Sequence, residues 1–84
     1  MSILGASNMG MQKYVVAFLS LGTGELKQTL VSAYSTLGAY REVLDTEFGK
    51  DYWRDYVSDH ATTEDVEGMV FNSDCYISAL KISS

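Results

Sequence analysis

Two glycines, Gly22 and Gly24, follow the apolar run 15–21 and raise the question of a phosphate-binding loop. Such a loop needs a Lys and then a Ser or Thr directly after its last glycine, at the start of a helix that faces the phosphate. Here Glu25 follows Gly24, and Lys27 stands where the dinucleotide-binding fingerprint requires a third glycine. The residues beyond alternate as in a strand. The sequence therefore predicts a tight turn between two strands rather than a phosphate site.

His60, the only histidine, lies close in sequence to Asp55 and Asp59, and these residue types suggest a metal site. Their spacing matches no metal-binding pattern, because neither a second His nor a pair of Cys residues accompanies them. Cys75 has no basic cluster nearby that would activate its thiol, and its strand-like surroundings predict burial. The sequence also lacks a nucleophile elbow for acyl transfer. We therefore expect no metal, no cofactor and no enzymatic activity.

Four carboxylates recur at every fourth position, the spacing that places side chains on one face of a helix: Glu47, Asp51, Asp55 and Asp59. They form one stripe only if the helix runs through Gly49. Neighbouring like charges at this spacing cost about 0.2–0.5 kcal/mol per pair. Two interpretations follow, namely a solvated helix face, or a surface that docks a basic protein or imitates the phosphates of nucleic acid.

Aromatic residues gather in the same region, where Tyr52, Trp53 and Tyr56 surround Arg54. Tyr52 and Trp53 are about 100° apart on a helix, so the two rings cannot both point into the core. Tyr, Trp and Arg are the residues that most often anchor protein interfaces. Either Trp53 completes the core of a small domain, or Trp53 and Arg54 form the centre of an interface.

The chain has 84 residues, of which 46% are hydrophobic, and this suits one small domain with its own core. We expect a mobile arm at residues 1–11 and a single α+β domain at residues 12–84. One cysteine cannot form an internal disulfide, and the N-terminus lacks the pattern of a signal peptide. The longest apolar run is far shorter than a membrane helix. These features predict a cytoplasmic protein without membrane contact.

Charge is distributed unevenly along the chain. Residues 1–41 hold three cations and one acid, a net charge of +2, whereas residues 42–84 hold three cations and ten acids, a net charge of −7. The acidic half repels nucleic-acid phosphates, so direct binding of DNA or RNA is not expected. The same half attracts basic protein surfaces, although acids that only keep a small domain in solution explain it as well.

Three segments have the patterns of strands. Residues 12–21 and 75–82 are apolar at both alternating sets of positions, which is typical of strands with two buried faces. Residues 26–31 alternate between apolar and polar side chains, as edge strands do. The two strands that are apolar on both faces should be neighbours, so the predicted strand order is 2-1-3.

The stretch between the second and third strands has a helical period. Ser35 is a good N-cap, and Leu37, Tyr40 and Leu44 then fall on one apolar stripe. The segment 50–59 continues the helical pattern, and a third, short helix is expected from about Thr63 to Phe71. The sequence thus predicts an α+β fold, a small three-stranded sheet in the arrangement ββααβ with the helices packed on one face.

That fold leaves the other face of the sheet without helices. In the first strand, either the set beginning at Tyr14 or the set beginning at Val15 points away from them, and both sets are apolar. Uncovered apolar surface of this kind marks a binding site for a partner or for a second copy of the chain. The residues expected to mediate self-association lie on the first strand and on the edge strand: Val15, Ala17, Leu19, Leu26, Gln28 and Leu30.

The segments KYVVAFLSL…GELKQTLVSAYSTLGAY and FNSDCYISALKI resemble small uncharacterised accessory proteins of tailed bacteriophages, in which a short hairpin runs into a helix and a closing strand. The resemblance covers residues 12–44 and 71–82. It implies a viral protein that acts in the cytoplasm of the host. It carries over no functional residue, because the family has no catalytic signature.

Three functions are compatible with these features. The first is a non-enzymatic phage accessory protein that binds and inhibits a host enzyme or defence complex with a basic surface. Its anchors would be Tyr52, Trp53, Arg54 and Tyr56, with the four spaced carboxylates steering association. The second is a structural protein that self-assembles through the apolar sheet face or the edge strand. The third is a protein that sequesters a nucleotide-like messenger, with the anion held by Lys13, Lys27 and Arg41.

Overall fold

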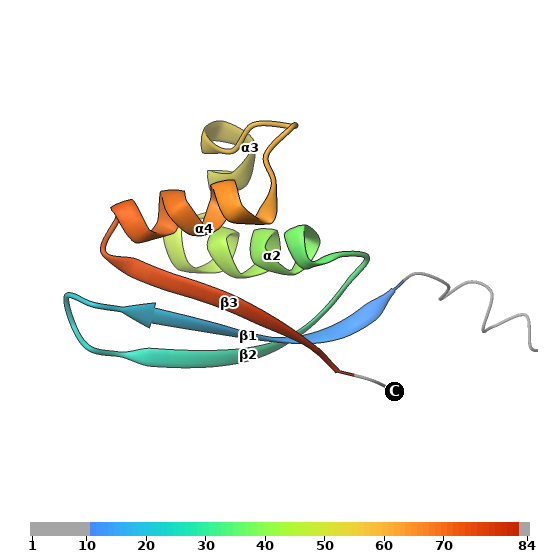
Figure 1. The fold of residues 1–84 in the computed structure, drawn as a ribbon, viewed down its shortest axis with the longest axis horizontal. Coiled ribbons are helices and arrows are strands. Elements are labelled where there is room, and N and C mark those ends of the chain that lie inside the picture. The colour runs from blue at the N-terminus through green and yellow to red at the C-terminus, as the bar shows by residue number, and fades with distance from the viewer. Residues whose placement is uncertain (1–10, 83–84) are drawn as a thin grey trace, which may run out of the picture.

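The computed structural model describes residues 11–82, which form a three-stranded antiparallel sheet and three helices (Figure 1). The elements are β1 (Gln12–Ser20), β2 (Leu26–Ala33), α2 (Thr36–Phe48), α3 (Tyr52–Tyr56), α4 (Thr63–Asn72) and β3 (Cys75–Ile82). The predicted α+β fold is confirmed. The arm expected at residues 1–11 lies outside the described residues, apart from Met11.

The sheet has the strand order β2-β1-β3, as the apolar patterns of the strands predict. β1 lies in the centre, where Val15 pairs with Leu30 of β2 on one side and with Leu80 of β3 on the other. Both of its faces are apolar, although helices cover only one of them. β3 is an edge strand, although it is apolar on both faces too.

The segment with the two glycines is a hairpin turn, as predicted. The N–H of Ser20 donates to the carbonyl of Glu25 at 2.9 Å, and the N–H of Gly24 donates to the carbonyl of Ser20 at 2.7 Å. Gly24 has a φ of 74°, in the left-handed region that glycine adopts at no steric cost. Gly22 is not among the residues with positive φ, so the backbone requires only one of the two glycines.

Side-chain caps fix where two of the helices begin. Ser35 Oγ accepts a hydrogen bond from the N–H of Gly38 at 3.1 Å, which satisfies a free donor in the first turn of α2. At α4, Thr62 Oγ1 accepts from the N–H of Asp65 while Asp65 Oδ2 accepts from the N–H of Thr62. This reciprocal capping box sets the start of α4 at Thr63, where the sequence predicts it.

The helix does not run through Gly49, so the condition for one continuous acidic stripe fails. α2 ends at Phe48, where Gly49 takes a φ of 117° and Asp51 a φ of 72°. Both values are far from helical, and α3 therefore begins with a new direction. Glu47 lies on α2, whereas Asp55 lies on α3.

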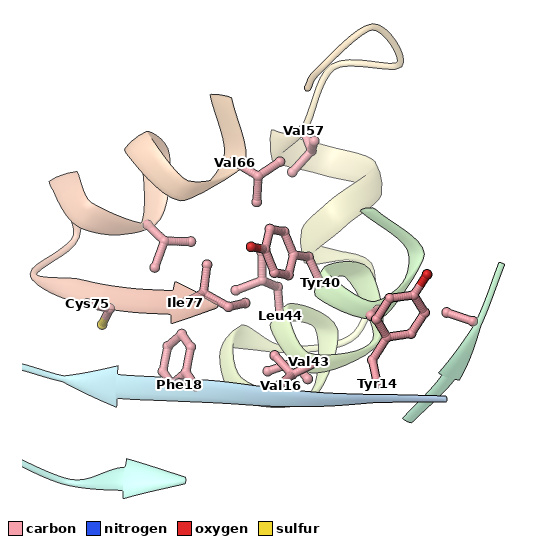
Figure 2. Packing of buried hydrophobic residues seen from close by; sticks show 13 residues of the cluster. Tyr14, Val16, Phe18, Tyr40, Val43, Leu44, Val57, Val66, Cys75 and Ile77 are labelled. Carbon is pink, nitrogen blue, oxygen red and sulfur yellow. The ribbon is translucent and has the colours of Figure 1, made fainter. Parts of the chain in front are cut away.

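All three helices lie on one side of the sheet, and the core fills the space between these layers (Figures 1 and 2). Tyr14, Val16 and Phe18 point from β1 toward the helices and are buried there. Leu44 of α2 and Val66 of α4 complete this core from the opposite side. Because strand residues alternate between faces, the set that begins at Val15 lies on the face away from the helices. Within residues 11–82, none of the helices has the length and apolar character that a bilayer-crossing segment needs.

Candidate interaction surfaces

One whole face of the sheet is left uncovered by the described part of the chain (Figure 1). The strand registers place twelve side chains on it, and we call this set the uncovered sheet face: Lys13, Val15, Ala17, Leu19, Leu26, Gln28, Leu30, Ser32, Tyr76, Ser78, Leu80 and Ile82. All six residues predicted for self-association belong to it. It is therefore a single surface that spans all three strands.

The uncovered sheet face presents large apolar side chains in rows across the strands. Leu30, Val15 and Leu80 form one row, in which the two leucines are 60% and 70% exposed. Leu26, at 56% exposure, opens a second row. Between these rows Ala17 occupies the middle of the face, flanked by polar residues. The arrangement is two apolar ridges with a lower strip between them.

Charge on this face is confined to its ends. None of the three strands contains an Asp or Glu, although the chain has eleven such residues. Lys13 stands at one end, beside the start of β1. Glu25 and Asp74 flank the opposite end, since their carbonyls accept hydrogen bonds from the N–H groups of Ser20 and Leu21 at the end of β1. The face thus has a basic end, a neutral middle and an acidic end.

The four spaced carboxylates do not share one surface. Glu47 Oε1 lies 3.1 Å from Nζ of Lys27 on β2, and this hydrogen-bonded ion pair raises the pKa of Lys27. Asp51 and Asp55 both pair with Arg54, at 3.3 and 3.4 Å. Asp59 lies exposed in the connection between α3 and α4. The ion pairs reduce the charge that α3 can offer to a partner.

The predicted aromatic anchors divide between core and surface. Trp53 and Tyr52 are partly buried and pack against the core, which favours the interpretation that Trp53 completes it. Burial raises the pKa of Tyr52, and the nearby Tyr56 adds to this effect. The Tyr56 ring lies 5.0 Å from that of Tyr52 but is 70% exposed. Tyr56 and Arg54 are thus the anchor residues of this group that are exposed at the surface, and Arg54 is held there by its two ion pairs.

A groove between α3 and α4 is the feature that sequence reasoning missed. It has a volume of about 380 Å³ and an apolar lining that includes Val57, Ala61, Val66 and Met69. Tyr56, His60 and Asp65 line it as well. These apolar lining residues come from α4 and from the connection that precedes it, so no single helical stripe reveals them. The sequence did carry one sign of an acidic surface in this region, because residues 55–80 contain no Lys or Arg.

The groups considered for ligand chemistry are not brought together. Lys13 lies on the uncovered sheet face, while Lys27 lies on the opposite face of the sheet and is paired with Glu47. Arg41 on α2 contacts Asp45 at 3.8 Å. Cys75 is buried, as predicted. Among residues 11–82 no three His, Cys, Asp or Glu side chains are grouped as metal ligands would be.

Comparison with known proteins gives no match: no family model, no curated protein and no solved structure is significantly similar to the chain. The resemblance to phage accessory proteins and the absence of enzymatic activity therefore stay predictions. The functional argument rests on the two surfaces themselves, the uncovered sheet face and the groove.

Proposed function

We propose that the protein is a non-enzymatic interaction protein that assembles with a second copy of itself through the uncovered sheet face. The observation that carries this proposal is the pair of apolar ridges, on which Leu30 and Leu80 are more than half exposed. Exposed leucines on one continuous face carry a free-energy cost in water that a covering surface removes. Two sheets stacked face to face provide that cover, as in a β-sandwich.

The charge distribution favours a second copy over a basic partner at this face. The chain has a net charge of −5, so two copies repel each other wherever their acidic surfaces meet. The strands contain no Asp or Glu, and stacking through the sheet keeps the helical layers of both copies on the outside. A basic partner would find no carboxylate in the middle of this face.

The charges at the two ends favour an antiparallel arrangement of the copies. In that arrangement Lys13 of one copy lies near Glu25 and Asp74 at the hairpin end of the other. The parallel arrangement would place Lys13 against Lys13. The antiparallel stack is also closed by a two-fold axis, so it gives a dimer rather than a fibre.

The size of the face sets the strength that we expect. Three strands about 4.8 Å apart, with eight residues each at about 3.3 Å, give a footprint of roughly 400 Å² per copy. Two copies then bury close to the ~1,000 Å² of accessible surface at which specific interfaces begin. Interfaces of this size are typical of weak, transient contacts, so we expect a dissociation constant in the micromolar range rather than a permanent dimer.

Light scattering coupled to size exclusion tests the proposal. At roughly 100 µM, where a micromolar contact is saturated, the full chain should have twice its monomer mass of 9.3 kDa. The double variant Leu30→Glu, Leu80→Glu should be a folded monomer, because both side chains are exposed and repulsion replaces apolar contact. The matched control is Tyr34→Glu, which changes a side chain of similar exposure outside the face. A monomeric wild-type chain, or a dimer that keeps its mass in the double variant, would contradict the proposal.

A second proposal is supported by a different observation, the stretch 55–74, which holds six Asp or Glu residues and no Lys or Arg. We propose that this region binds a host protein with a basic surface, in line with the phage inhibitor hypothesis. A tagged full chain should then capture a stoichiometric partner from bacterial lysate at low salt and lose it at high salt. Capture that is independent of salt, or no capture, would count against it.

A further inference from the structure

The groove between α3 and α4 combines an apolar floor with an acidic surround. Val57 and Val66 are buried at its base, and Ala61 and Met69 are partly exposed along its sides. Its volume of about 380 Å³ is at the low end of the range of ligand sites, ~300–1,000 Å³. That space suits a few apolar side chains of a larger partner. The flexible Met69 side chain can adapt to their shapes.

Asp65 lines this groove, and further carboxylates lie in the stretch 55–65 that supplies most of its lining. Asp55, Asp59, Glu64 and Asp65 are all exposed in the stretch that forms the groove. Asp55 is paired with Arg54, and Asp65 caps α4 through its own Oδ2. Asp59 and Glu64 are exposed, and their negative charges add to that of Asp65. With no Lys or Arg in residues 55–80, the local field is negative.

We infer that the groove binds a basic amphipathic helix of a partner protein, whose apolar side chains enter the groove while its Lys and Arg residues meet the acidic rim. This inference rests on the proposal of a basic partner and gives that partner a binding site. A helix laid into a groove is a recurrent mode of peptide recognition, in which side chains one turn apart act as anchors. The exposed ring of Tyr56 at the edge of the groove offers a further apolar contact.

Charge excludes the nearest alternative, a second copy of this chain. Two acidic rims brought face to face would repel, whereas the uncovered sheet face has no such penalty. Residues 1–10 contain no Lys or Arg either, so that segment lacks the side-chain charges that match the rim. The groove and the sheet face therefore take different occupants.

Synthetic peptides test the inference with the full chain. The probe is an amphipathic helical peptide of Leu and Lys, and two peptides of equal length serve as comparisons, one of Ser and Lys and one of Leu and Glu. In ¹H–¹⁵N and methyl NMR spectra, the Leu/Lys peptide should shift the signals of Val57, Ala61, Val66 and Met69 most. The Ser/Lys and Leu/Glu peptides should leave these signals in place, because each lacks one of the two required contacts.

A matched pair of charge reversals adds a second readout. Asp59→Lys removes a rim carboxylate and should weaken binding of the Leu/Lys peptide roughly threefold to tenfold. Glu42→Lys makes the same change at an exposed site of α2 away from the groove and should alter binding less than twofold. Circular dichroism verifies that both variants fold.

Three results would overturn the inference: equal binding of the Ser/Lys peptide, binding of the Leu/Glu peptide, or shifts that lie outside the groove. The two proposals also fail separately. A host partner that is captured from lysate but is not displaced by the Leu/Lys peptide would leave the basic partner in place and remove the groove as its site. Peptide binding in the groove without any captured host partner would support the groove as a binding site and count against the basic host partner.

Discussion

The hydroxyl of Tyr40 donates a hydrogen bond to Oε2 of Glu67, and this contact joins α2 to α4 above the sheet. Tyr40 is almost completely buried, with its ring in the middle of the core (Figure 2). Its hydroxyl group therefore needs a partner, because a buried phenol without a hydrogen bond is destabilising. Since α4 forms one side of the groove, this contact also holds the groove in shape.

Tyr40→Phe keeps the ring and removes only this hydrogen bond. Hydrogen bonds to charged groups contribute about 1.5–3 kcal/mol, and Glu67 retains access to water, so we expect a loss of about 1–2 kcal/mol in the free energy of unfolding. Urea unfolding followed by circular dichroism measures it. Tyr34→Phe, at an exposed tyrosine, should change the free energy of unfolding by less than about 0.5 kcal/mol. Equal losses in the two variants would mean that the Tyr40 contact has no special role.

The same contact predicts a loss of stability at high pH. Burial, together with the hydrogen bond to Glu67, raises the pKa of Tyr40 far above its ordinary value of 10.0. The folded protein then keeps a proton that the unfolded chain releases, so the contribution is complete below pH 10 and declines as the pH rises above it. The slope is about 1.4 kcal/mol per pH unit. Urea unfolding at a series of pH values should show this slope in the wild type and a smaller one in Tyr40→Phe.

The positive φ of Gly49 predicts that Gly49→Ala and Gly22→Ala differ sharply in their effect on the free energy of unfolding. Gly49→Ala forces a side chain into a φ of 117°, and we expect a loss of about 1–2 kcal/mol in the free energy of unfolding. Gly22→Ala has no heavy atom within 4 Å of the added methyl group and no positive φ, so it should be neutral. Thermal unfolding of both variants compares them directly. A neutral Gly49→Ala would mean that α2 and α3 can join into one helix after all.

The antiparallel dimer predicts that a charge swap restores what each single reversal disturbs. Lys13→Glu and Glu25→Lys should each weaken self-association, whereas the double variant should recover most of it. Within one copy the two residues lie at opposite ends of the face, so recovery reports a contact between copies. Analytical ultracentrifugation gives the three dissociation constants. Additive weakening in the double variant would exclude the antiparallel arrangement.

Much of the fold follows from local patterns in the sequence. The strand order follows from two such patterns, because the glycine turn pairs residues 12–20 with the next strand and the apolar pattern shared with residues 75–82 predicts those two strands as neighbours. The starts of α2 and α4 follow from Ser35 and Thr62, whose side chains accept hydrogen bonds from free N–H groups. Each of these features depends on residues close together in the chain.

The rest depends on contacts between distant residues, which local patterns do not contain. Alternation in β1 defines two apolar faces, but only packing against α2 and α4 decides that Phe18 faces the helices and Leu19 does not. Gly49 is compatible with both a softened helix and a break, and the left-handed Asp51 completes the break. The groove forms only when residues near Val57 and Met69 meet across the connection. Sequence alone therefore predicted the strand order and six of the twelve residues of the uncovered sheet face. It left open which set of β1 side chains faces the helices, and it predicted the helical surface only in part.

The most direct measurement of the central claim is an isotope-filtered NMR experiment on a mixture of ¹³C-labelled and unlabelled chains, in which only contacts between copies give signals. A dimer through the uncovered sheet face predicts such contacts from the methyl groups of Ala17, Leu30 and Leu80. It predicts none from Val57 or Met69 in the groove. Contacts between copies that come only from the helical layer, or no contacts at all at roughly 100 µM protein, where a micromolar dimer is saturated, would contradict the account.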